Sequence, residues 1–96
     1  MPTDPYFHML VQDVFSLRSR GTVVTGSVDT GTLRPGDEIM IRGGLADQKA
    51  VVTAIEALHK VIEEAKAGDT VGILLKDVNR ADVDRGFELM SPDWVR

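Results

Sequence analysis

The 96-residue chain is 43% hydrophobic and 27% charged, a composition typical of one globular domain. It has no cysteine, which excludes disulfides, thiolate metal sites and a cysteine nucleophile. The formal net charge of −4 argues against a broad basic face that grips a nucleic-acid backbone, so no DNA partner is expected and any RNA contact must be local. No apolar run approaches the ~18 residues of a membrane-spanning helix, and no membrane partner is expected.

The N-terminal stretch MPTDPYFHML has no basic region ahead of an apolar run and no small-residue cleavage site. It therefore predicts no secretory signal and a cytoplasmic location. Met1 followed by PTDP fits both a piece of a longer protein and a separate small protein.

Short, evenly spaced turns between β-branched runs predict an all-β barrel or sandwich. Apolar residues alternate from Phe7 to Leu17, with Asp13 interrupting the row, which is typical of strands with one buried face. In the later strand Lys49–Leu58, alternation places Glu56 on the face opposite Ile55. Further strands are expected at Thr22–Val28, Glu38–Arg42 and Phe87–Met90.

The remaining segments give less uniform signals. Leu58–Lys66 fits the apolar face of a short helix as well as the end of a strand followed by a turn. The apolar run in AGDTVGILLK predicts a turn and then a strand buried on both faces. NRADVDRG predicts a polar turn before the last strand.

The stretch GTVVTGSV, residues 21–28, has the glycine spacing of a phosphate-binding P-loop. However, Ser27 and Val28 stand where that loop needs Lys and then Ser or Thr. The four residues between the glycines are strand formers, whereas a P-loop opens a helix onto the phosphates. No zinc-hydrolase, dinucleotide-binding or nucleophile-elbow motif is present either. The sequence therefore predicts a non-enzymatic chain without cofactor or metal.

Four stretches of the sequence carry a family resemblance: DVFSLRSRGTVVTGSVDTGTLRPGDEIMI, VVTAIEALHK, AGDTVGILLKDV and DRGFEL. In this order and at these intervals they resemble domain 2 of elongation factor Tu and related translational GTPases, over about Asp4 to Met90. The resemblance implies a single closed antiparallel β-barrel over residues 1–96. It also implies that the GTPase domain and a third domain of the family are absent from this chain.

The resemblance further implies a pocket for the 3′-terminal adenosine of aminoacyl-tRNA. Its positions correspond here to Leu17, Val23, Glu56 and Leu74. Aliphatic side chains suit base stacking, and a carboxylate can accept hydrogen bonds from a ribose hydroxyl or an adenine amino group. For the three aliphatic residues, the alternative is that they simply form part of the barrel core.

A neighbouring pocket for the esterified amino acid is implied at Asp13, Phe15 and Thr25, which agree with the family. Three positions depart from it: Gln12 replaces a glutamate, Thr70 an asparagine, and His59 an arginine beside the adenosine. The turn Arg18-Ser19-Arg20 matches the loop that faces ribosomal RNA in the family.

Two functions follow as hypotheses. The first is a non-catalytic translation elongation factor module that binds the aminoacyl-tRNA 3′ end or ribosomal RNA in the context of a translational GTPase. The second is a structural or protein-interaction barrel that docks on a GTPase or another protein partner and has lost RNA binding.

Overall fold

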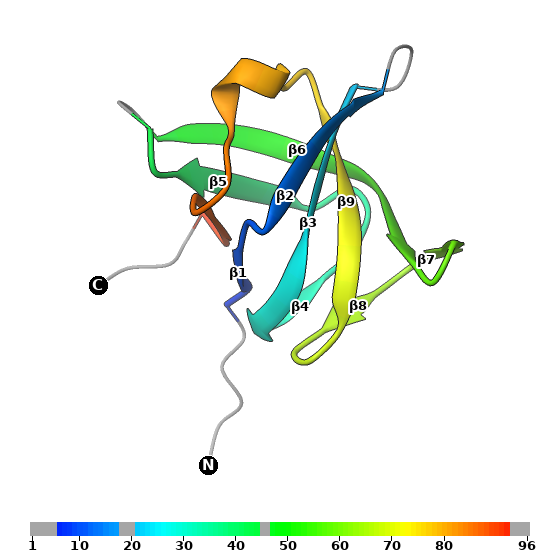
Figure 1. The fold of residues 1–96 in the computed structure, drawn as a ribbon. Helices are drawn as coiled ribbons and strands as arrows, with labels where there is room; N and C mark the ends of the chain where they lie inside the picture. Colours follow the sequence, from blue (N-terminus) through cyan, green and yellow to red (C-terminus); the bar gives the residue numbers. More distant parts are fainter. Residues whose placement is uncertain (1–5, 18–20, 45–46, 93–96) are drawn as a thin grey trace.

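The computed structural model describes residues 6–17, 21–44 and 47–92, and these form an almost entirely β structure (Figure 1). Turn signals rich in Gly, Pro and Asp separate β-branched runs, so the chain folds as successive short strands. The elements are β1 (His8–Leu10), β2 (Asp13–Leu17), β3 (Gly21–Thr30), β4 (Thr32–Leu33), β5 (Glu38–Arg42), β6 (Gln48–Ala57), β7 (Lys60–Ile62), β8 (Ala65–Lys66), β9 (Thr70–Lys76), the 3₁₀ turn η1 (Arg80–Asp82) and β10 (Glu88–Met90).

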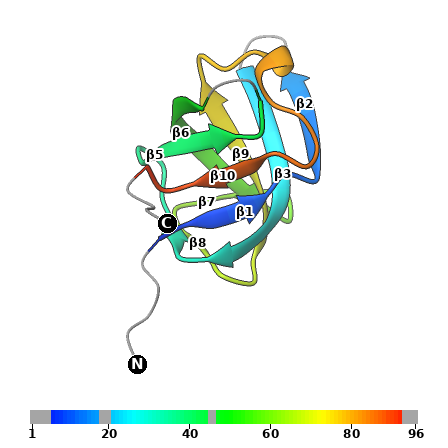
Figure 2. The same cartoon turned by 90° about the vertical axis from the view of Figure 1, so that its left-hand side faces the viewer.

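The sheet of the described residues closes on itself as an antiparallel six-stranded barrel in the order β1-β10-β5-β6-β9-β3, with β3 returning to β1. Figure 2 shows β1, β10 and β5 side by side on one wall. The ten-residue β3 closes the barrel because its first half pairs with β2 and its last residues pair with β1. The predicted fold, a closed antiparallel barrel, is confirmed.

The barrel core follows from the alternation of side chains along each strand. In β3, Thr22, Val24 and Val28 point inward and are at most 3% exposed, while the odd-numbered positions face outward. The prediction that β9 is buried on both faces is wrong. Only the alternate residues Val71, Ile73 and Leu75 are buried in this strand, and the outer face of β9 is partly exposed.

The segment Leu58–Lys66 contains no helix, which corrects the helical alternative from the sequence. Leu58 and His59 take positive φ angles of 53° and 66° and form a two-residue turn between β6 and β7. β8 then pairs with β4 in a separate small ladder. The β6–β7 hairpin projects from the barrel on the right of Figure 1.

Thr22 is the one buried polar side chain among the described residues, at 1% exposure, and its hydroxyl donates to the carbonyl of Val78. This bond ties β3 to the segment that follows β9. Thr22→Val should therefore lower the free energy of unfolding by about 1–3 kcal/mol, because it leaves a buried carbonyl unpaired.

Urea denaturation followed by circular dichroism would measure that loss. Thr70→Val is the matched control, since Thr70 is exposed and its hydroxyl meets only the hydroxyl of Ser27. The control should change stability by less than about 0.5 kcal/mol. Equal effects of the two variants would show that the Thr22 hydrogen bond contributes nothing.

Candidate binding site on the outer wall of the barrel

The outer wall formed by β2, β3, β9 and β6 carries two transverse rows of side chains set by the strand register. The first row runs across the strands through Phe15, Val23, Leu74 and Ala54. The second row runs through Asp13, Thr25, Gly72, Glu56 and Val61. The first row is apolar, whereas the second has a carboxylate at two of its positions and a gap at its glycine.

A bulge in β6 puts Glu56 on this outer wall. Val52 and Ile55 are both fully buried although only two residues lie between them, whereas a regular strand puts positions i and i+3 on opposite faces. The register shifts between Val52 and Ala54, and the hydroxyl of Thr53 at the shift donates to the carbonyl of Leu74 at 3.1 Å. The extra residue reverses the alternation, so Glu56 faces outward opposite Gly72.

A shallow hollow of about 20 Å³ lies on the wall where the two rows meet. Its volume is about that of one water molecule, so a planar ligand would lie across it rather than inside it. The residues that line it are Leu17, Val23, Ala54, Glu56, Gly72 and Leu74. All four positions assigned to the adenosine by family resemblance are therefore neighbours around one depression.

The aliphatic side chains at the hollow are not part of the barrel core. Leu17 is 37% exposed, and Val23 and Leu74 are half-buried on the outer face. The alternative that these residues only fill the core is therefore wrong. Their partial exposure leaves an apolar platform available to a ligand.

Gly72 creates the hollow, and sequence reasoning did not assign it a role. A Cβ atom at this position would lie 3.4 Å from Val23 Cγ1 and 3.7 Å from Thr25 Cγ2, in the space that is now open. The signal in the sequence is an isolated glycine within the strand run TVGILLK, a pattern that marks a close approach by another group. Ala54, which also lines the hollow, carries no comparable signal.

The residues assigned to an aminoacyl pocket surround the hollow without lining it. Asp13 pairs with Thr25 in the second row, and Phe15 is 50% exposed in the first. Gln12 precedes β2 and donates its backbone N–H to the carbonyl of Thr25 at 2.8 Å. Thr70 lies two residues before Gly72 on the same outer face of β9.

Two assignments remain, His59 and the basic turn. His59 occupies the exposed tip of the β6–β7 hairpin and does not line the hollow. The basic turn Arg18-Ser19-Arg20 lies outside the described residues.

Among the described residues, the charge that lines the hollow is negative. Glu56 is the one ionisable residue that lines it among the described residues, and its side chain is exposed. Asp13 forms an ion pair with Arg85, whose Nε lies 3.4 Å from Asp13 Oδ1; sequence reasoning did not anticipate this partner. An apolar platform beside a carboxylate can hold a flat ring and accept hydrogen bonds from hydroxyl or amino groups, but it does not attract phosphate.

The described residues contain no helix of the length and apolarity needed to cross a membrane. They also contain no cluster of three or more His, Cys, Asp or Glu side chains arranged for a metal ion.

His8 lies between two carboxylates, with Nδ1 2.8 Å from Asp29 Oδ2 and Nε2 3.3 Å from Glu88 Oε2. These contacts join β1, β3 and β10 where the barrel closes.

The closed antiparallel strands define an all-β barrel domain with a partly exposed outer wall. Over residues 21–90, most of the chain, the sequence matches the family described as elongation factor Tu domain 2. The chain therefore belongs to the elongation factor Tu domain 2 family, as its motifs predicted. Val23, Glu56 and Leu74 lie within the matched region, whereas Leu17 precedes it.

Proposed function

We propose that this chain is a non-catalytic translation-factor module whose outer wall binds the 3′-terminal adenosine of aminoacyl-tRNA. Membership of the family of elongation factor Tu domain 2 supports a barrel of this kind. The single observation that carries the proposal is the gathering of Leu17, Val23, Leu74 and Glu56 around Gly72 on one wall. A cytoplasmic location follows from the same proposal.

The chemistry of the hollow favours a nucleoside over other parts of an RNA. The adenine ring stacks on the aliphatic side chains, which offer an apolar surface without sequence-specific hydrogen bonds. The Glu56 carboxylate accepts a hydrogen bond from a ribose hydroxyl or from the adenine amino group. A terminal nucleotide suits this site best, because its base is not held in a continuous stack.

The affinity of the barrel alone must be low. One base stacked on an aromatic ring contributes roughly 1–3 kcal/mol, and aliphatic side chains should contribute no more. A binding free energy of about 4 kcal/mol corresponds only to a millimolar dissociation constant. We therefore expect the remaining contacts to come from a GTPase domain and its associated parts. This need for further contacts agrees with the net charge of −4, which provides no general attraction for RNA.

Glu56→Ala tests the proposal. Backbone amide shifts of the labelled protein would be followed by NMR during titration with aminoacyl-tRNA, deacylated tRNA and a short CCA oligonucleotide. We expect shifts localised at Leu17, Val23, Glu56 and Leu74, and a two- to tenfold weaker affinity in the variant, about the effect of one lost hydrogen bond.

Glu63→Ala serves as the control, because Glu63 is exposed and does not line the hollow. It removes the same charge from the protein and should leave the titration unchanged. The absence of localised shifts at millimolar oligonucleotide would overturn the proposal.

A second candidate function is docking on a GTPase or another protein. The β6–β7 hairpin favours it, because Leu58 is 92% exposed and Val61 is 67% exposed. Apolar side chains gathered in this way on a projecting hairpin are typical of a protein contact. A titration without RNA-dependent shifts, together with loss of partner binding in Leu58→Ser, would favour this second function.

A further inference from the structure

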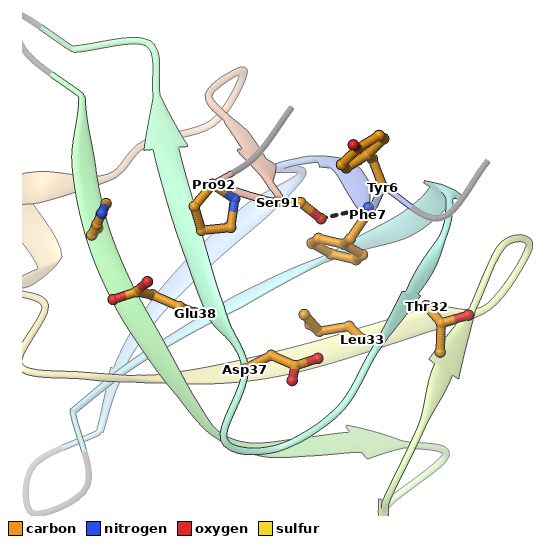
Figure 3. A pocket seen from close by; sticks show the side chains of 9 residues that line it. Tyr6, Phe7, Thr32, Leu33, Asp37, Glu38, Ser91 and Pro92 are labelled. Carbon is orange, nitrogen blue, oxygen red and sulfur yellow. Dashed lines mark hydrogen bonds between the residues drawn. The ribbon is translucent and has the colours of Figure 1, made fainter. Parts of the chain in front are cut away.

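A second concavity, larger than the hollow, lies near one end of the barrel and shares no residue with it. Its volume of about 450 Å³ falls within the range of ligand pockets, roughly 300–1,000 Å³. We call it the end groove. It is lined by Tyr6, Phe7, Thr32, Leu33, Asp37, Glu38, Lys49, Ser91 and Pro92 (Figure 3).

The end groove has an apolar floor that the fold holds in place. Phe7 and Leu33 form it and are at most 2% exposed. Ser91 fixes the segment beside them, since its Oγ accepts the N–H of Phe7 at 2.8 Å and its own N–H donates to the carbonyl of Phe7 at 3.0 Å. Tyr6, 40% exposed, and Pro92 stand above the floor, so a ring and an aliphatic surface border the groove.

Asp37 supplies a carboxylate in a fixed position on the opposite side of the groove. Its Oδ2 accepts the backbone N–H of Arg34 at 2.9 Å, and its backbone carbonyl accepts the N–H of Val52 at 2.9 Å. Its side chain reaches toward Leu33 in Figure 3. The adjacent Glu38 adds a second exposed carboxylate to the lining, against one cation, Lys49.

We propose that the end groove receives an arginine side chain presented by a partner protein. The aliphatic stem of an arginine would cover Phe7 and Leu33, and its planar guanidinium would pack on the Tyr6 ring while donating to Asp37. Lysine fits less well, because its compact, strongly hydrated ammonium cannot stack on a ring. The net charge of −4 and the excess of carboxylates in the lining complement a basic partner segment. The inference does not depend on RNA binding at the hollow.

Asp37→Asn provides a sharp test because an asparagine keeps the turn. The side-chain carbonyl oxygen of the asparagine can still accept the backbone N–H of Arg34, while the negative charge of the carboxylate is lost. The chain contains a matched control in the turn Lys66–Asp69, where Asp69 Oδ2 accepts the N–H of Lys66 at the same 2.9 Å. Asp69 lies outside the end groove, so Asp69→Asn makes the same chemical change in the same kind of turn.

The probe would be N-acetyl-Gly-Arg-Gly-amide, compared with peptides that carry citrulline or lysine instead of arginine. NMR signals of the Leu33 methyl groups, the Tyr6 ring and the Ser91 amide would be followed at millimolar peptide. We expect the arginine peptide to shift them, and the citrulline peptide to bind at least fivefold more weakly. Asp37→Asn should weaken binding of the arginine peptide about two- to fivefold, and Asp69→Asn should not.

Several outcomes would overturn the proposal. Equal binding of the arginine and citrulline peptides would make the groove a neutral apolar site. Unchanged binding of the arginine peptide in Asp37→Asn would show that the Asp37 carboxylate takes no part in recognition. If raising the protein concentration alone moved the same NMR signals, the groove would be occupied by a second copy of the chain. If an RNA oligonucleotide moved these signals more strongly than the arginine peptide did, the groove would be an RNA site.

Discussion

Replacing Gly26 with alanine is expected to destabilise the barrel by about 3 kcal/mol or more, or to prevent folding. A Cβ atom at this position would lie 2.4 Å from the backbone oxygen of Leu10 and 3.3 Å from two side-chain atoms of Met9. The backbone of β1 cannot move away easily, because β1 pairs with β3 on one side and β10 on the other. The added methyl group therefore separates the strands that close the barrel.

Urea denaturation monitored by far-ultraviolet circular dichroism would measure the effect. Gly72→Ala is the control, since its Cβ atom would make only ordinary contacts of 3.4 and 3.7 Å and its φ is not positive. The control should retain the stability of the parent or gain a few tenths of a kcal/mol, because alanine restricts the unfolded chain more than glycine does. A Gly26→Ala protein as stable as the control would contradict the expected role of Gly26 at the closure.

Both glycines of GTVVTGSV thus follow from the barrel. Gly21 begins β3 with a φ of 109°, a backbone conformation that strains other residues, and Gly26 allows the close passage of the chain at Leu10. Residues between them form the strand that their β-branched side chains predicted. The resemblance of their spacing to a P-loop is a coincidence of two barrel requirements.

The sequence predicted those parts of the fold that depend on local alternation. Strands rich in Val, Ile and Thr were expected near their observed positions, because side-chain alternation and turn residues act within a few positions. A turn within Leu58–Lys66 was one of two alternatives, but its left-handed backbone at Leu58 and His59 was not predictable, since that conformation is normally signalled by Gly or Asn. Its formation depends on the pairing of β6 with β7, which composition does not reveal.

Four of the residues around the hollow could be named from the sequence, but Ala54, Gly72 and the geometry of the hollow could not. Family resemblance selected Leu17, Val23, Glu56 and Leu74, and alternation from Ile55 correctly placed Glu56 on an outer face. The bulge at Thr53, which allows both Val52 and Ile55 to be buried, has no local sequence signature. The ion pair of Asp13 with Arg85 joins residues far apart in the chain, and only the folded barrel brings them together.

Gly72→Ala, the control for stability, is also expected to reduce adenosine binding. Its methyl group would occupy the hollow between Val23 and Thr25, which raises the floor on which the adenine ring is proposed to stack. Stacking of a base on an aromatic ring contributes roughly 1–3 kcal/mol. Aliphatic side chains should reach only the lower end of that range, so the loss corresponds to about a fivefold weaker affinity. In the NMR titration with the CCA oligonucleotide, the shifts at Leu17, Val23 and Leu74 should become small or disappear.

A comparison of Gly72→Ala with Glu56→Ala distinguishes the contribution of base stacking from that of the Glu56 carboxylate. Gly72→Ala raises the surface on which the ring is proposed to lie but keeps the carboxylate, whereas Glu56→Ala removes the carboxylate but keeps the hollow. If both variants weaken binding, the adenosine lies across the hollow with its polar groups toward Glu56. If Gly72→Ala binds the oligonucleotide as the parent does, the base does not stack at the hollow, even if Glu56→Ala is impaired. Since the alanine preserves the strand, a loss of binding in Gly72→Ala could not be attributed to a damaged barrel.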